Sequence, residues 1–147
     1  NTPIEELNES LPQLRNLALG MSNFLSHILE SRDGEFYSQY DLKTKTPVKN
    51  SSNFNVQVAG IRALLKSSEY FRLNSYKMSV INAYLYLNRE MWNPKTGFYT
   101  LSGNRPVTRF EVTKALSVLK PLTDEPLLDA ASRNQLKTLL HSWSSAL

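Results

Sequence analysis

The sequence predicts an all-α protein of about five helices, arranged as two antiparallel helical hairpins followed by a C-terminal helix. Apolar residues recur at intervals of three and four along most of the chain, which is the spacing of one helix face. A motif also repeats: Gly34 and Gly97 are each followed closely by a Phe-Tyr pair, at 36–37 and 98–99. A long repeat of this kind indicates stacked helical units that bury their faces against one another.

The first helix is predicted from about Ser10 to Ser31, and residues 3–9 could add a short extra turn. Ser10 is a suitable N-cap, and Pro12 is tolerated in a first turn. Asp33-Gly34 ends the helix. Its apolar positions form one face: Leu11, Leu14, Leu17, Ala18, Met21, Phe24, Leu25, Ile28 and Leu29.

Residues 35–40 are short and aromatic and predict an extended segment, and the polar residues 41–52 predict a loop. The second helix is predicted over about 53–70, with Ser51 or Ser52 as its cap. A break at Asn74-Ser75 opens the third helix, which covers about 75–92. This helix is apolar nearly all round, so we expect it to be well buried.

Asn93 to Gly97 is a strong turn signal, and residues 98–101 are predicted to be extended. The fourth helix opens at Val107 or Thr108 and ends before Pro121, and the fifth runs from about 126 to 145. The chain is predicted to form a single domain over residues 1–147. Because it begins without methionine, either a leader was removed or the chain is a piece of a longer protein.

Composition narrows the function classes. The net charge is +4, with the densest basic stretch at Lys43, Lys45 and Lys49. No nucleic-acid recognition signature accompanies this stretch, so it is interpreted as a solvated loop and no nucleic-acid partner is expected. The chain has no cysteine, and neither His27 nor His141 shows metal-ligand spacing, so no metal or cofactor is predicted. No apolar run approaches the roughly 20 residues of a membrane span.

The two Gly-Phe-Tyr segments are the first candidate site. Glycine lets the chain leave a helix and reverse direction, and the aromatic rings then either cover the open hairpin end or present a platform on which sugars stack. Asn53, Asn55 and Gln57 add amides at a helix N-terminus, which suit hydroxyl-rich ligands. Alternatively, Asn53 is simply an N-cap. Residues 55 and 57 cannot share one helix face with it, because each step of two residues turns about 200°.

The segments "WNPKTGFY", "GEFYSQYDLKTKTPVKNSSNFNVQ" and "GFYTLSGNRPVT" resemble hairpins of the six-hairpin glycosidase-like (α/α) toroids found beside bacterial polysaccharide-synthesis and polysaccharide-processing enzymes. A complete toroid has more than twice as many helices, so the chain would be a partial toroid, a helical array or a fragment. In that family the cleft lies where inner-helix N-termini and the preceding loops converge. The resemblance implies these ligand-binding positions: Tyr37, Tyr40, Asp41, Asn53, Asn55, Gln57, Tyr99, Arg105, Arg109 and Glu111.

Three functions follow as expectations. The first is a non-catalytic module that binds a polysaccharide or an envelope protein in a bacterial periplasm or outside the cell, with a cytoplasmic location left open. The second is part of a glycoside hydrolase or lyase toroid, which would need two carboxylates roughly 5–10 Å apart; no pair among Glu35, Asp41 and Glu111 is singled out by the sequence. The third is a protein-interaction scaffold, with Trp143 as a docking edge or, alternatively, packed on its own domain.

Overall fold

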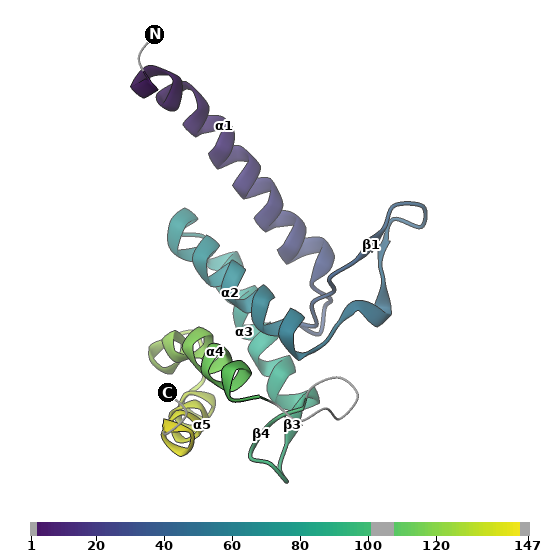
Figure 1. Ribbon diagram of the computed structural model, residues 1–147, viewed down its shortest axis with the longest axis vertical. Coiled ribbons are helices and arrows are strands. Elements are labelled where there is room, and N and C mark those ends of the chain that lie inside the picture. Colours follow the sequence, from purple (N-terminus) through teal and green to yellow (C-terminus); the bar gives the residue numbers. More distant parts are fainter. Residues whose placement is uncertain (1–2, 101–107, 145–147) are drawn as a thin grey trace.

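The computed structural model describes residues 3–100 and 108–144, and for residues 3–10 the backbone only. Within these residues the chain is all-α, with five α-helices and two short strand pairs, as predicted (Figure 1). The helices are α1 (Pro3–Phe24), α2 (Phe54–Phe71), α3 (Asn74–Glu90), α4 (Arg109–Leu119) and α5 (Ala130–Ser142). A π-helical segment, η1 (Leu25–Leu29), continues α1, and the 3-10 helices are η2 (Lys49–Ser51) and η4 (Lys120–Asp124). The strands are β1 (Tyr40–Asp41), β2 (Thr46–Pro47), β3 (Trp92–Asn93) and β4 (Phe98–Tyr99).

Capping residues explain where the helices begin. Thr108 and Glu111 form a capping box at the start of α4, which makes Thr108, one of the two residues predicted to open that helix, its cap. Asn53, rather than Ser51 or Ser52, caps α2 by accepting a hydrogen bond from the Val56 N–H. The predicted start of α1 was wrong, because the helix already runs from Pro3 and contains Pro12 in its interior.

The start of the fifth helix was also predicted too early. After α4 the chain does not stop at Pro121 but continues as the 3-10 helix η4, where a proline near the start is accommodated. A turn follows, and α5 then begins at Ala130 with Asp129 as its cap, accepting from the Ser132 N–H at 2.8 Å. The fifth helix is therefore shorter than predicted at both ends.

The centre of the molecule is the antiparallel pair α2 and α3 (Figure 1). Only Arg72 and Leu73 connect the two helices, and Arg72 takes a left-handed conformation that ends α2. Helix α3 is buried along much of its length, as predicted, while α4, η4 and α5 pack along one side of the pair. The largest fully buried side chains are Tyr76, Tyr84, Tyr99, Phe36, Phe54, Phe98, Ile61, Leu64, Leu87, Leu116, Leu119 and Leu122.

The two Gly-Phe-Tyr segments have matching local structures. In the first, Glu30 and Phe36 form an isolated antiparallel bridge around a turn that contains Gly34 at φ 93°. In the second, β3 and β4 pair antiparallel around a turn that contains Gly97 at φ 70°. In each segment the phenylalanine is buried: the Phe36 ring lies over Gly60 of α2, and the Phe98 ring packs against Phe54. The covering role predicted for these aromatic residues is therefore present in both segments.

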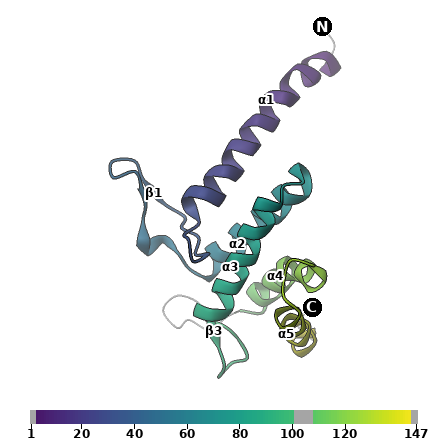
Figure 2. The same ribbon diagram turned by 180° about the vertical axis from the view of Figure 1, so that it is seen from behind.

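Helix α1 packs on the α2–α3 pair with its polar face. The hydroxyl of Ser22 lies 2.7 Å from that of Ser67, and the hydroxyls of Ser26 and Ser79 are 2.6 Å apart. The Tyr76 hydroxyl donates to Asn23 Oδ1 at 2.5 Å. The apolar face predicted for this helix points the other way, and most of its side chains are exposed. The N-terminal half of α1 extends beyond the other helices in both views (Figures 1 and 2).

Glu30 lies where η1 ends, close to α3. Burial raises the pKa of its carboxyl from 4.5 to about 8, and a hydrogen bond with Ser79 acts in the opposite direction. Its Oε2 atom is buried without a hydrogen-bond partner. The folded protein therefore holds this carboxyl in its neutral form at neutral pH.

We expect Gly34→Ala to destabilise the protein several-fold more than Gly97→Ala. Both glycines have positive φ, which costs other residues about 1–2 kcal/mol. A Cβ at Gly34 would also overlap the backbone carbonyl of Asn82, whereas a Cβ at Gly97 would meet open space. Urea unfolding of the two variants measures the difference, and equal losses of stability would contradict the close approach of the Gly34 turn to α3.

We also expect the stability of the protein to fall as pH rises from 4.5 to 8, because of Glu30. In this window the unfolded carboxyl has lost its proton while the folded one keeps it, so the folded state binds more protons. Glu30→Gln should remove this part of the slope and be the more stable form at and above pH 8. The measurement is urea unfolding of both proteins across the window; an unchanged slope in the variant would show that Glu30 is not the source.

Candidate functional site

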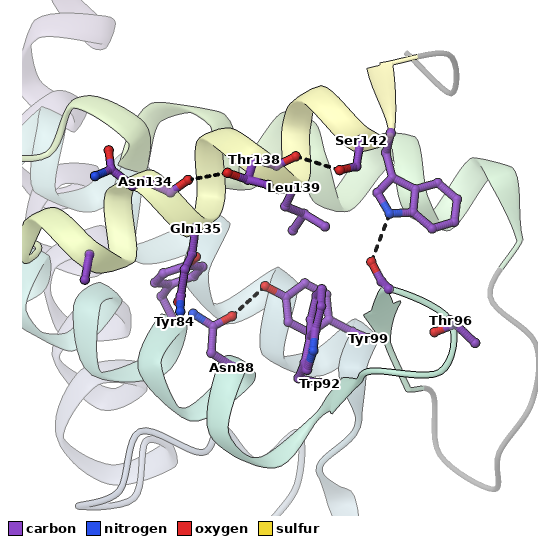
Figure 3. Close-up of a pocket in the computed structure, with 13 residues that line it drawn as sticks. Tyr84, Asn88, Trp92, Thr96, Tyr99, Asn134, Gln135, Thr138, Leu139 and Ser142 are labelled. Carbon is purple, nitrogen blue, oxygen red and sulfur yellow. Dashed lines mark hydrogen bonds between the residues drawn. The ribbon is translucent and has the colours of Figure 1, made fainter.

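A cavity of about 790 Å³ lies between α3, the β3–β4 hairpin and α5 (Figure 3). Its size is within the range of roughly 300–1,000 Å³ that is common for small-ligand sites. We call it the α3–α5 pocket. Its lining residues are Tyr84, Asn88, Trp92, Thr96, Gly97, Tyr99, Ala131, Asn134, Gln135, Thr138, Leu139, Ser142 and Trp143.

The β3–β4 hairpin positions the aromatic wall of the pocket. Asn93 Oδ1 accepts from the Lys95 N–H at 3.0 Å, and the Gly97 N–H donates to the Asn93 carbonyl at 3.0 Å, which closes the turn. This pairing sets Trp92 opposite Tyr99, and their rings meet edge-on at 5.3 Å. Tyr99 is fully buried and packs on Phe54 of α2, so the wall is attached to the central helix pair.

Helix α5 provides the opposite wall. Trp143 packs edge-on against Phe98 and its Nε1–H donates to the Gly97 carbonyl at 3.0 Å, which links the end of α5 to the hairpin (Figure 3). Thr138 and Ser142 donate their hydroxyl protons to carbonyls one turn earlier in the same helix. Their oxygen lone pairs therefore stay available as acceptors at the pocket edge.

The floor of the pocket is a neutral polar cluster. The Tyr99 hydroxyl donates to Asn88 Oδ1 at 2.6 Å. Burial raises the pKa of Tyr99 and, to a smaller degree, that of Tyr84, so both phenols stay protonated across the physiological range. None of the lining residues carries a formal charge. The pocket therefore offers hydrogen-bond donors and acceptors without an electrostatic preference for either sign of ligand charge.

This combination of groups is suited to binding rather than to acid–base chemistry. The Trp92 indole offers an exposed apolar surface, and the amides of Asn88, Asn134 and Gln135 can both donate and accept. The lining residues include no Asp, Glu or His, so they supply no proton-transfer pair of the kind that glycoside hydrolysis uses. Within the described residues no cluster of His, Cys, Asp or Glu is arranged to hold a metal ion.

Of the residues that the resemblance singled out, Tyr99 is the one that lines this pocket. Asn53 acts as the cap of α2. Gln57 is fully buried at 0% exposure: its Nε2 donates to the carbonyls of Gly34 and Ala83 at 2.7 and 3.0 Å, and its Oε1 accepts from the Phe36 N–H at 2.9 Å. The Gln57 amide has no face left for a ligand, so we do not carry this residue forward as a binding residue.

The structure does bring the N-termini of α2 and α4 together, as expected for the predicted site. Asn55 Nδ2 lies 3.3 Å from Glu111 Oε2, and both side chains are outside the α3–α5 pocket. Glu111 also accepts from the Thr108 hydroxyl in the capping box. Arg109 is exposed at the start of α4, and Arg105 lies outside the described residues.

The predicted residues of the first Gly-Phe-Tyr segment lie apart from the pocket. The Tyr37 hydroxyl donates to Glu35 Oε2 at 3.1 Å, and burial raises the pKa of Tyr37. The Tyr40 ring meets Phe24 of α1 edge-on at 5.4 Å. Asp41 Oδ1 accepts from the N–H groups of Lys43 and Thr44, so it shapes the β1–β2 turn.

Sequence reasoning missed most of the pocket. Trp92 stands in the turn motif that was recognised, but it was assigned to the third helix rather than to a wall. The residues of α5 carry a signal that could have been used, because Ala131, Asn134, Gln135, Thr138 and Ser142 follow helical spacing and form one small and polar stripe. The five side chains are exposed, so this stripe forms the open, solvent-accessible side of the pocket.

No protein-family model matches the sequence, and no curated protein or solved structure is significantly similar to it. Within the described residues no helix is long and apolar enough to cross a bilayer. The chemistry of the α3–α5 pocket therefore has to be interpreted from its own residues.

We expect Gln57→Met to destabilise the fold by about 3 kcal/mol or more. The substitution keeps the volume but removes three buried hydrogen bonds: the Phe36 N–H and the Gly34 carbonyl lose the partner that Gln57 provides, at about 1–3 kcal/mol each, while the Ala83 carbonyl keeps its position within α3. Asn55→Ala, on the exposed side of the same helix, is the matched control and should stay within about 0.5 kcal/mol of wild type. Chemical denaturation gives both values; similar values for the two variants would contradict the structural role of Gln57.

Proposed function

We propose that this chain is a non-catalytic binding module that takes a neutral, hydroxyl-rich ligand, of which a carbohydrate is the leading example, in the α3–α5 pocket. The observation that carries the proposal is the composition of the lining. The indole rings of Trp92 and Trp143 line the pocket beside amides and hydroxyls, with no charged side chain among the lining residues.

Each part of the lining has a counterpart in a sugar. The C–H face of a pyranose packs on an aromatic ring, and Trp92 is 40% exposed and so offers such a surface. Sugar hydroxyls both donate and accept, which matches the dual character of side-chain amides. A pocket without charge would bind a phosphorylated or strongly ionic ligand poorly, because nothing in it would replace the hydration of that charge.

We also propose that the chain functions in a bacterial envelope or beside polysaccharide-handling enzymes. The support for this setting is the resemblance of the two Gly-Phe-Tyr hairpins to those of (α/α) toroids, and the convergence of the α2 and α4 N-termini is compatible with it. The alternative of a glycoside hydrolase or lyase would need a pair of carboxylates, and no carboxylate is among the residues that line the α3–α5 pocket.

We expect the purified chain to bind neutral oligosaccharides saturably in a glycan array and in calorimetry, and we expect Trp92→Ala to weaken that binding about tenfold or more. Tenfold corresponds to about 1.4 kcal/mol, the size of one good ring contact. Tyr70→Ala, a 67% exposed ring near the end of α2 and outside the pocket, is the matched control and should bind as wild type.

Two results would overturn the proposal. One is the absence of saturable binding to any neutral glycan by correctly folded protein. The other is binding that survives Trp92→Ala unchanged, which would place the ligand elsewhere on the molecule. Asn134→Ala provides a second variant, because this residue is exposed and its loss removes an amide from the pocket without disturbing the core.

A further inference from the structure

An uninterrupted apolar stripe runs along the outer side of α1 and into η1. We call it the α1 stripe; its side chains are 37–65% exposed, far from the burial expected of a helix face of this composition. At 1.5 Å per residue it is about 21 Å long. The members of the stripe are Leu14, Leu17, Met21, Phe24 and Ile28.

The stripe is exposed because α1 uses its opposite side to pack on the body. Ser22, Asn23 and Ser26 hydrogen-bond α2 and α3, and the Arg15 guanidinium lies 5.3 Å from the centre of the Phe71 ring. At 100° per residue these contacts centre on the side of the helix diametrically opposite the stripe. Rotating α1 to bury the stripe would break all of them, so an outside surface has to cover it.

The spacing of the stripe points to another helix as that surface. Its members alternate steps of three and four, which is the a/d seam of a coiled coil rather than the broader face of a helix that packs on a globular core. If Leu14 is taken as position a of the heptad, the residues that contact α2 and α3 occupy positions b, c and f, on the opposite side of the helix. The positions that flank the seam hold uncharged or small residues: Leu11, Gln13, Ala18, Gly20, Leu25 and His27.

We propose that the α1 stripe is a homodimer interface, on which the α1 of a second copy of this chain packs in antiparallel orientation. The flanks contain no Asp, Glu, Lys or Arg between residues 11 and 29, and Arg15 lies on the other face, so the flanks select no oppositely charged partner and oppose no identical one. Ala18 and Gly20 at the middle of the seam let two helix backbones approach closely. A self-complementary stripe of this kind closes a two-fold dimer.

The antiparallel orientation of the two α1 helices follows from the position of the β1–β2 hairpin beside the stripe. The β1–β2 hairpin contacts its C-terminal end, through Tyr40 on Phe24, and carries the exposed residues Lys43 and Lys45. A parallel partner would bring two such basic hairpins together, whereas an antiparallel partner places each hairpin beside the other copy's N-terminal half. That half projects away from the remaining helices and leaves room for it (Figures 1 and 2).

A membrane surface is a weaker fit to the same stripe. Helices that lie in a membrane interface present a lysine- and arginine-rich polar face toward the headgroups. Here the polar face of α1 is occupied by α2 and α3, and Arg15 is its only basic residue between residues 11 and 26.

The test is the mass of the full chain in solution, measured by sedimentation from low to high micromolar concentration. We expect a reversible monomer–dimer equilibrium in wild type and monomer only in Met21→Glu, with the same helical circular dichroism in both. Met21 is 65% exposed, so its charge disturbs no packing within the monomer. Phe110→Glu, at a 76% exposed ring on α4, is the matched control and should dimerise as wild type.

The chain contains no cysteine, so engineered cysteines report the orientation directly. In an antiparallel seam the a positions of one helix face the d positions of the other, so the register that places Met21 opposite Phe24 also brings Leu17 of one copy to Ile28 of the other. A mixture of Leu17→Cys and Ile28→Cys should therefore form the mixed disulfide on oxidation, and self-linked Leu17→Cys would overturn the antiparallel arrangement. The proposal also fails if wild type is monomeric throughout, if Met21→Glu still dimerises, or if monomeric wild type binds phosphatidylcholine vesicles through the stripe.

Discussion

The three hydrogen bonds of the Gln57 amide hold together three segments that are distant in the sequence. One amide in the first turns of α2 accepts from the Phe36 N–H and donates to the carbonyls of Gly34 and Ala83, so α2, α3 and the first Gly-Phe-Tyr turn share one buried junction. Phe36 then packs over Gly60, where a Cβ would overlap its ring. Because this junction joins the base of α1 to the central pair, the position of the outer helix depends on it.

The two candidate surfaces lie on opposite sides of the α2–α3 pair. The aromatic pocket lies at the end where α5 and the β3–β4 hairpin meet, while the apolar stripe of α1 lies on the outer side of the opposite flank. A dimer formed through α1 would therefore leave both pockets open. A dimer with two weak sites would bind a polymer of repeating units more tightly than a monomer, because binding at the first site raises the effective concentration of the polymer at the second.

Helix positions were predictable because they depend on local signals, and the site was not because it depends on tertiary contacts. The start of α4 was predicted at Val107 or Thr108, and its cap is Thr108, whose capping box is encoded within four residues. The amide at Gln57 suggested a ligand from its type alone; only the fold shows that its partners are backbone groups. The exposure of Met21 could not be predicted from the sequence either, because hydrophobic periodicity identifies an apolar face but not what covers it.

The tie between Trp143 and the Gly97 carbonyl has a consequence for how the pocket opens. One wall belongs to the buried α2–α3 core, and the other is a single helix held at this end by one ring and one hydrogen bond. Segments with few such attachments open at lower free energy than the global unfolding of a protein. A ligand that contacts both walls would therefore slow amide hydrogen exchange in α5 selectively, and its affinity would be reduced by the fraction of time that this helix spends detached.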